Sequence, residues 1–146
     1  MEVSNELYPV GDEQTKAMLE AGPDGPIVMV NLLKYREKAE YSDGRETDLS
    51  GREAYAIYGQ AVAKLVEAHG GRIIFAGQVS HLTIGVVDEL WDDVALAEYP
   101  SRGALVAMST CAAYAEIAPH REAGLKGQLN IETTHSQAMT GRSAGQ

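Results

Sequence analysis

The residues best suited to chemistry are polar side chains at positions that the surrounding pattern marks as apolar. Asn31 interrupts the apolar run 27–33, and a buried amide needs hydrogen-bond partners, so Asn31 can orient a ligand or bond to a neighbouring loop. Glu98 shares one face of a predicted strand with Val94 and Leu96. Partial burial there would raise the pKa of the Glu98 carboxyl and suit it to general-base work.

A second pair of candidates, His120 and Arg121, follows a proline in the C-terminal part of the chain. The Arg121 guanidinium offers a planar fork of donors to a carboxylate or an enolate oxygen, and the His120 imidazole is of a type that titrates near neutrality. With Glu98 they form the predicted catalytic set. Structural roles stay open, since Glu98 can pair with Arg72 or Arg121 inside the fold. Arg121 can equally tie a helix end to the sheet, and His120 can be exposed.

The predicted substrate-binding residues are expected to line the same apolar cleft; they are Asn31, Tyr35, Tyr58, Arg72 and His81. The Tyr58 phenol can donate to a ligand oxygen, although tyrosines at helical spacing belong more often to a core. The histidines show neither HxxxH nor HExxH spacing, and no P-loop or dinucleotide-binding glycine pattern occurs. We therefore expect no metal site and no cofactor, and a small organic molecule as the ligand.

Apolar periodicity and end signals indicate the strands and helices that could position these residues. Ser50 forms a capping box with Glu53 and begins a helix that runs to about His69. Ser101 can cap a short helix that runs through Met108. Pro119 is expected to end the last helix. The polar segment 36–49 is expected to be a mobile loop. The predicted strands cover 27–35, 72–79 with a continuation over 82–87, 94–99 and 127–133, and the shorter helices cover 12–21, 101–108 and 111–118.

These elements follow one another as a short helix and then two β-α-β units. Two such halves predict a ferredoxin-like split βαβ fold of the α+β class, with a four-stranded antiparallel sheet. Right-handed crossovers place both main helices on one face of that sheet. We expect an N-terminal extension with a short helix (1–26), the α+β domain (27–133) and a flexible tail (134–146).

Both faces of the predicted sheet are rich in apolar residues. In the first strand Ile27, Met29 and Leu33 lie on one face, and Val28 and Val30 lie on the other. An antiparallel sheet with one wet face should alternate polar and apolar residues, and this one does not. The main helices cover one face, and the short N-terminal helix is too small to cover the other. We therefore expect a homodimer with its sheets face to face, in which burying roughly 600 Å² per chain contributes on the order of 15 kcal/mol before association costs.

Composition argues against several classes of function. A chain of 146 residues is the size of one domain, and 12 basic against 21 acidic residues give it a net charge of −9. Such an acidic surface repels phosphate backbones, which argues against nucleic acid as a partner. No apolar run is long enough for a membrane span, the first residues lack a signal-peptide pattern, and Cys111 is the single cysteine. We therefore expect a cytoplasmic protein with no membrane partner.

Several short strings stand in a recognisable order along the chain. They are VNLLKY at 30–35, HGGR at 69–72, Trp91-Asp92 with EYPS at 98–101, and Tyr114 with APHREAGL at 118–125. The set resembles a bacterial family of domains of unknown function, numbered 1330, over about residues 27–133. The resemblance implies the dimeric α+β barrel superfamily, with a ferredoxin-like protomer. Cofactor-free monooxygenases, lactone isomerases and haem-binding branches of that superfamily imply, by analogy, a small-molecule pocket between sheet and helices.

Three functions remain open on the sequence alone. The first is a cofactor-free enzyme of the oxygenase or isomerase type, acting on an organic acid or an aromatic metabolite. In it, one apolar cleft would collect Asn31, Glu98, His120 and Arg121. The second is a non-catalytic homodimer that binds or senses a metabolite. The third is an interaction module with a closed interior. We favour the first, mainly on the implied superfamily.

Overall fold

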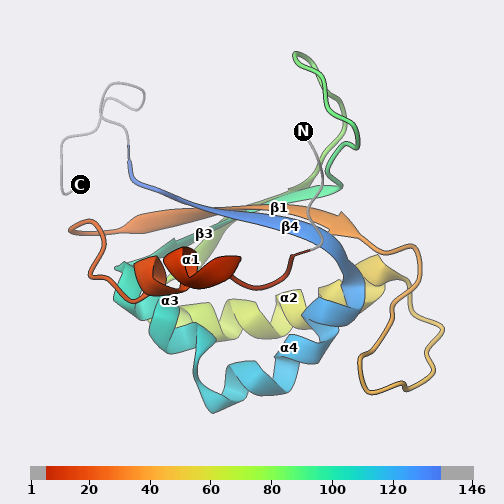
Figure 1. The fold of residues 1–146 in the computed structure, drawn as a ribbon, viewed down its shortest axis with the longest axis horizontal. Coiled ribbons are helices and arrows are strands. Elements are labelled where there is room, and N and C mark those ends of the chain that lie inside the picture. Colours follow the sequence, from red (N-terminus) through yellow and green to blue (C-terminus); the bar gives the residue numbers. More distant parts are fainter. Residues whose placement is uncertain (1–5, 136–146) are drawn as a thin grey trace.

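The structure, a computed structural model, describes residues 6–135 and is built around one antiparallel sheet (Figure 1). Its strands are β1 (Ile27–Tyr35), β2 (Arg72–Gln78), β3 (Asp93–Tyr99) and β4 (Leu125–Thr133). They lie in the order β2-β3-β1-β4, and every neighbouring pair is antiparallel. This topology confirms the predicted ferredoxin-like arrangement of the α+β class. The part of the predicted tail at 136–146 lies outside the described residues.

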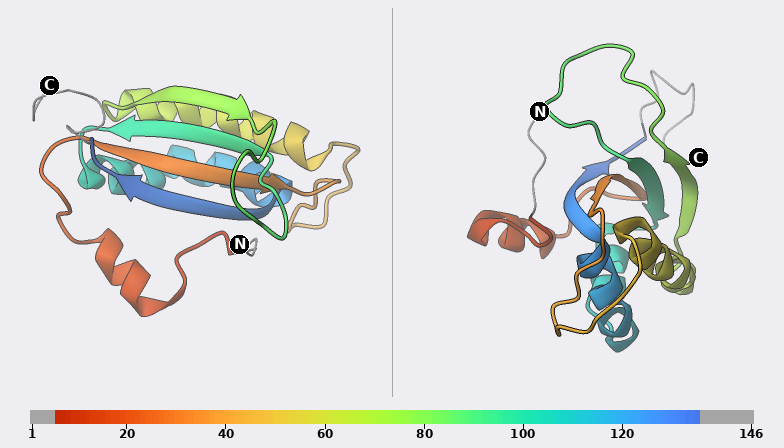
Figure 2. Two further views of the ribbon diagram at one scale, coloured as in Figure 1. Left: turned by 90° about the horizontal axis from the view of Figure 1, so that it is seen from above. Right: turned by 90° about the vertical axis from the view of Figure 1, so that its right-hand side faces the viewer.

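Within residues 6–135, helices cover one face of the sheet, and none covers the other (Figure 1). The helices are α1 (Gly11–Met18), α2 (Gly51–Ala68), α3 (Arg102–Ser109) and α4 (Ala112–Gly124). Figure 1 shows α2, α3 and α4 beneath the sheet, and Figure 2 shows α1 beside the β4 edge, away from the uncovered face. We call the helix-facing side the inner face and the uncovered side the outer face. Among residues 6–135 no helix is long and apolar enough to cross a bilayer.

Two helix starts follow the predicted capping signals. The Ser50 side chain accepts a hydrogen bond from the Glu53 amide (3.1 Å), and the Glu53 carboxylate accepts one from the Ser50 amide (2.9 Å). These reciprocal bonds confirm the capping box at the start of α2. The Ser101 hydroxyl accepts from the Ala104 amide (3.1 Å) and caps α3 in the same way.

The predicted end of the last helix at Pro119 is wrong, because α4 continues to Gly124 with the proline inside it. A proline removes one intrahelical hydrogen bond, and packing of the last turn offsets that loss. Ala123 is fully buried, and its carbonyl accepts from the Glu40 amide (3.0 Å). The Gly124 carbonyl accepts from the Arg36 amide (2.8 Å), so the final turn is bonded to the segment that follows β1.

The segment 36–49 is a loop, as expected, but it is packed against the helices. Ala39 and Tyr41 are buried there against Ala54 of α2 and Ala123 of α4. The Ala39 amide donates to the Leu49 carbonyl (3.0 Å), which closes the segment on itself. Buried side chains within a polar stretch thus attach the segment to two helices. The predicted continuation of the second strand over 82–87 is wrong as well, since these residues form no strand.

Both faces of the sheet carry apolar side chains, but their surroundings differ. The inner face and the helices form the main core, made of Ile27, Met29, Tyr58, Val62, Val66, Ala97, Tyr99 and Met108. Cross-strand pairs on the outer face are formed by Val30, Leu32, Phe75, Val94, Leu96, Leu129 and Ile131. Phe75 and Ile131 remain 55% and 46% exposed, because no helix covers this side.

In strand β4 the polar side chains face the helices and the apolar side chains face outward, the reverse of an ordinary surface strand. Its polar residues Gln128, Asn130 and Glu132 lie opposite Leu33, Asn31 and Met29 of β1, on the inner face. Its apolar residues Leu129 and Ile131 therefore point outward, since successive residues of a strand alternate between faces. The polar row therefore lies on the helix-facing side of the sheet, where Gln128 and Glu132 are partly buried and Asn130 is exposed.

Candidate functional site

A cavity of about 1100 Å³ lies between the inner face of the sheet and the helices. Strands β1, β3 and β4, helices α2, α3 and α4, and part of the N-terminal segment contribute to its walls. Apolar side chains make up one part of the lining, among them Met29, Leu33, Val62, Val66 and Ala97. A space of this size is slightly larger than the usual range of small-molecule sites, about 300 to 1,000 Å³.

A chain of hydrogen bonds runs across the cavity from β1 to α4. The Gln128 side-chain amide donates to Asn31 Oδ1 (2.9 Å), and Arg121 Nη2 donates to Gln128 Oε1 (2.7 Å). The amide of Gln128 can satisfy both neighbours only in one orientation, so the three side chains fix one another. Arg121 Nη2 also donates to the Leu7 carbonyl (2.6 Å). The guanidinium is therefore oriented by two uncharged oxygens.

Tyrosines form a second group along the inner surface of the cavity. The hydroxyls of Tyr58 and Tyr114 lie 3.1 Å apart and share a hydrogen bond. The ring of Tyr55 packs against those of Tyr58 and Tyr35, with centroids 5.2 and 5.4 Å apart. Burial raises the pKa of Tyr35, Tyr55 and Tyr58 well above the ordinary value. These phenols stay neutral and act as hydrogen-bond donors at physiological pH.

A charged pair lies at one end of the cavity. Tyr35 Oη donates to Asp93 Oδ2 (2.7 Å), and Arg52 Nη1 lies 2.9 Å from Asp93 Oδ1. The Arg52 guanidinium also stacks over the Tyr35 ring, 4.7 Å from its centroid. The carboxylate and the guanidinium neutralise each other, and the tyrosine is held between strand and helix.

A second charged pair joins α3 to β4 at the cavity's edge. Arg102 binds Glu132 through Nε (2.7 Å) and Nη2 (2.8 Å), and this bidentate pairing lowers the pKa of the Glu132 carboxyl. Arg102 Nη1 also donates to the Ala17 carbonyl (3.0 Å). We call residues 6–22 the N-terminal strap. Arg102 and Arg121 thus bond the strap to the cavity rim at two points.

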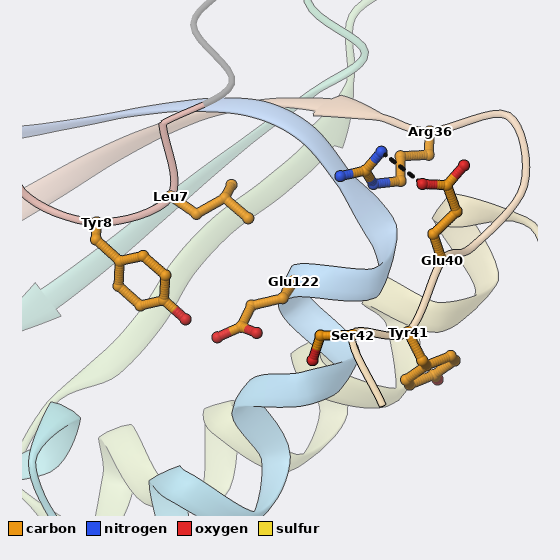
Figure 3. Close-up of a pocket in the computed structure, with 7 residues that line it drawn as sticks. All are labelled: Leu7, Tyr8, Arg36, Glu40, Tyr41, Ser42 and Glu122. Atoms are coloured by element: carbon orange, nitrogen blue, oxygen red, sulfur yellow. Dashed lines mark hydrogen bonds and ion pairs between the residues drawn. The ribbon is translucent and has the colours of Figure 1, made fainter. Parts of the chain in front are cut away.

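A smaller pocket of about 300 Å³ opens where the strap meets the segment after β1 (Figure 3). Figure 3 shows the Tyr8 hydroxyl and the Glu122 carboxylate directed toward each other across it. Arg36 Nη1 pairs with Glu40 (3.2 Å) at its far side, while Arg36 Nε is buried without a hydrogen-bond partner. Two carboxylates against one guanidinium make this opening a poor site for an anion.

The structure brings together four of the predicted site residues and separates the other four from them. Asn31, Tyr35, Tyr58 and Arg121 all line the large cavity. His120 does not, because its side of α4 faces the segment after β1, where Nδ1 lies 2.7 Å from the Tyr41 hydroxyl. The expected convergence of His120 with Asn31 and Arg121 is therefore not found.

Glu98, Arg72 and His81 also lie away from the cavity. Glu98 is paired across the strands with Val28 and Arg72, so it belongs to the outer face. Arg72 Nε lies 3.2 Å from the Glu98 carboxylate, the ion pair that the sequence left open as an alternative. His81 is exposed in the segment between β2 and β3. The expectation that Glu98 meets Arg121 in one cleft fails because the two lie on opposite sides of the sheet.

Sequence reasoning missed several residues that line the cavity. They are Arg52, Asp93, Arg102, Tyr114, Gln128, Asn130 and Glu132. A signal existed for β4, because polar residues alternate strictly with apolar ones over 128–132. No comparable signal existed for Arg102 and Glu132, which are 30 residues apart in the chain and meet through the fold.

The buried tyrosines predict a loss of stability at alkaline pH. Burial raises the pKa of Tyr99 to about 12, and it raises the pKa of Tyr58 in the same direction. The folded state then holds these protons more tightly than the unfolded state. The stabilisation is fully present below the unfolded pKa of about 10 and is lost as the pH rises through the folded values. Urea denaturation followed by circular dichroism should show a falling midpoint above about pH 10.

A matched pair of variants isolates this effect. Tyr58→Phe should reduce the slope of stability against pH, whereas Tyr8→Phe should leave it unchanged, because Tyr8 is 63% exposed. A midpoint that stays constant from about pH 8 to pH 12 would contradict the assignment.

Comparisons with known proteins agree with the topology. The model of the DUF1330 family, a domain of unknown function, matches residues 45–133. The crystal structure of a Rhodopseudomonas palustris protein of unknown function is 35% identical and superposes with a TM-score of 0.78, covering 89% of this chain and 96% of that one. The methylated form of that protein, also 35% identical, gives a TM-score of 0.80 over 97% of this chain and 98% of its own.

A more distant likeness concerns the fold alone. A structure of an Arabidopsis thaliana protein is 14% identical and gives a TM-score of 0.50, covering 75% of this chain and 95% of that one. No curated protein matches this chain.

Proposed function

The chain belongs to the DUF1330 family of domains of unknown function, and from that premise we propose that it binds a small organic acid in the cavity between its sheet and its helices. The ligand would consist of an apolar body, aromatic or aliphatic, and one anionic head. Its body would lie against the apolar lining around Met29, Val62 and Ala97. Its head would meet the guanidinium of Arg121.

The partners of Arg121 are the observation that carries this proposal. Among residues 6–135, three arginines line the cavity together with three carboxylates, those of Glu6, Asp93 and Glu132. Arg52 is paired with Asp93, and Arg102 is paired with Glu132. Within the same part of the chain, Arg121 Nη2 donates instead to two uncharged oxygens. A positive charge in a partly desolvated site attracts an anion more strongly than it would in water. The neutral phenols of the cavity can add hydrogen bonds to the same head.

Binding is better supported than catalysis. A cofactor-free isomerase or oxygenase would use Arg121 and the tyrosine hydroxyls to stabilise an enolate or a phenolate oxygen, and it would also need a base. Glu98, the base expected from the sequence, is on the far side of the sheet from this cavity. Asp93 and Glu132 line the cavity but are each held in an ion pair. We therefore propose ligand binding as the function, with turnover as the second candidate.

Thermal shift and calorimetric titration test the proposal. Cinnamate and octanoate serve as probes of an aromatic and an aliphatic acid, and cinnamyl alcohol serves as the uncharged match of the first. A ligand present at 100 times its Kd stabilises a protein by about 2.7 kcal/mol, so an acid that binds should raise the Tm by several degrees. Cinnamyl alcohol should raise it less.

Two variants separate the site from general effects of charge. Arg121→Gln should weaken binding of the acids by about tenfold or more, since it keeps a hydrogen-bonding side chain and removes the charge. Arg45→Gln is the control, because Arg45 is an exposed arginine paired with Asp43 outside the cavity. Unchanged affinity in Arg121→Gln, or equal stabilisation by the alcohol and the acid, would count against the proposal.

We also propose that two copies of the chain pack through their outer sheet faces, in the cytoplasm. The outer face has an apolar centre, and ion pairs lie at its ends, Arg72 with Glu98 at one and Lys34 with Asp92 at the other. An apolar core with a charged rim is the usual anatomy of an interface.

A further inference from the structure

The connection between β2 and β3, residues 79–92, projects from the sheet on its outer side. We call this segment the β2–β3 arm. Figures 1 and 2 show it rising above the outer face, on the side opposite the helices. Its tip carries two aliphatic side chains, Ile84 and Val86, which are 89% and 90% exposed. Between them Gly85 has a φ of 112°, a conformation that other residues rarely adopt, and the chain bends at residues 84 and 85.

The base of the arm is firmly attached to the sheet. Lys34 Nζ donates to the Leu90 carbonyl (3.0 Å) and to the Asp92 carboxylate (3.2 Å). Glu89 pairs with Lys126 (2.9 Å), and Trp91 is buried. The arm is therefore anchored at its base, while its apolar tip is exposed to solvent.

We infer that the tip of the β2–β3 arm docks on a second copy of this chain and completes the interface begun by the outer sheet face. The inference rests on the homodimer proposed above. Burying these two exposed aliphatic side chains would stabilise a complex by about 25 cal/mol for each Å² removed from water. The arm stands on the same side as the face that the partner would cover, so its tip reaches past that face toward the partner.

The area of the sheet supports a role for the arm in the interface between two copies of the chain. Strands of seven to nine residues in a four-stranded sheet give a flat footprint of roughly 500 Å². A stable interface buries about 800 Å² on each partner. The flat outline of the sheet is smaller than that area, and in a twofold dimer each copy would add the surface of one arm to the interface.

Charge also favours a second copy. The chain carries a net charge of −9, so two copies repel each other wherever acidic surfaces meet. The stretch 79–87 contains no Asp, Glu, Lys or Arg, and residues 82–87 also contain no His. An uncharged, aliphatic tip can approach an identical acidic molecule at little electrostatic cost.

Sedimentation equilibrium on the full chain tests the inference. The double variant Ile84→Ser with Val86→Ser should raise the dimer dissociation constant by about 100-fold or more, because each dimer loses two apolar tips. The matched control is Ile57→Ser with Leu19→Ser, which removes two exposed aliphatic side chains from α2 and from the strap. The control should dimerise as the wild type does.

The outcomes separate this inference from the proposed dimer. If the wild type dimerises and the arm variant dimerises equally well, the arm inference is overturned and the sheet-to-sheet dimer stands. If the wild type is a monomer at micromolar concentration, both are overturned. Hydrogen exchange at 82–87 gives an independent reading, because docking should slow exchange there only at concentrations at which the dimer forms. Equal exchange in monomer and dimer would also overturn the inference.

Discussion

Replacing Gly124 by alanine should destabilise the fold by about 3 kcal/mol or more. Helices α2 and α4 approach each other backbone to backbone at this residue. A Cβ atom on Gly124 would collide with the Gly51 carbonyl oxygen and would lie 2.9 Å from the Tyr55 amide nitrogen. Neither atom can rotate away, because both belong to the main chain of α2. The two helices would have to separate, which would disturb the last turn of α4 and the segment bonded to it.

A glycine of α2, the helix that Gly124 approaches, supplies the control. Gly59 lies in the middle of α2, and a Cβ atom there would have no neighbour within 4 Å. Gly59→Ala should therefore raise the stability by up to about 1 kcal/mol through helix propensity. Urea denaturation measures both variants, with an unchanged slope as the sign that folding is still two-state. A wild-type midpoint for Gly124→Ala would contradict the close approach of α2 and α4.

Replacing Leu96 by glutamate should dissociate the proposed dimer, raising its dissociation constant by about 1000-fold or more. Leu96 lies in β3 on the outer face, between Val30 of β1 and Phe75 of β2. A dimer through this face would have to bury two unpaired carboxylates, one from each copy, at a cost of several kcal/mol. The folded protomer should survive, because this face of a single copy is already partly exposed.

Light scattering coupled to size-exclusion chromatography provides the measurement for this variant. Ile57→Glu is the matched control, since Ile57 is a partly exposed aliphatic residue on α2 rather than on the sheet. The control should remain dimeric at the same concentration. A dimer of wild-type affinity in Leu96→Glu would show that the copies do not meet through this face.

Local signals in the sequence were sufficient for most of the fold. The apolar run of β1 and the capping residues Ser50 and Ser101 depend on interactions within a few residues, and the structure confirms all three. The misplaced end of α4 shows where local rules fail. Pro119 does weaken the helix, but the burial of Ala123 and Gly124 against other elements decides where it ends.

The candidate site was harder to predict because both faces of the sheet are apolar. Strand alternation correctly groups Glu98 with Val94 and Leu96, but it does not tell which face meets the helices. If one face of the sheet were polar, the sequence would indicate that this face meets solvent and that the other meets the helices. In β4, however, the polar side chains lie on the inner face, so the rule that polar faces meet solvent would have predicted the wrong orientation. Side-chain pairs such as Arg52 with Asp93 also depend on the assembled fold.

If the cavity binds acids as proposed, the attachment of the strap would make the range of acids that bind depend on the residues before Met18. A shortened form beginning at Met18 would lack the carbonyls of Leu7 and Ala17, to which Arg121 and Arg102 now donate. Two guanidinium donors would then face water at a wider entrance. Such a form should admit bulkier acids and distinguish less well among them, so trimming of the first residues would act as a means of changing ligand preference.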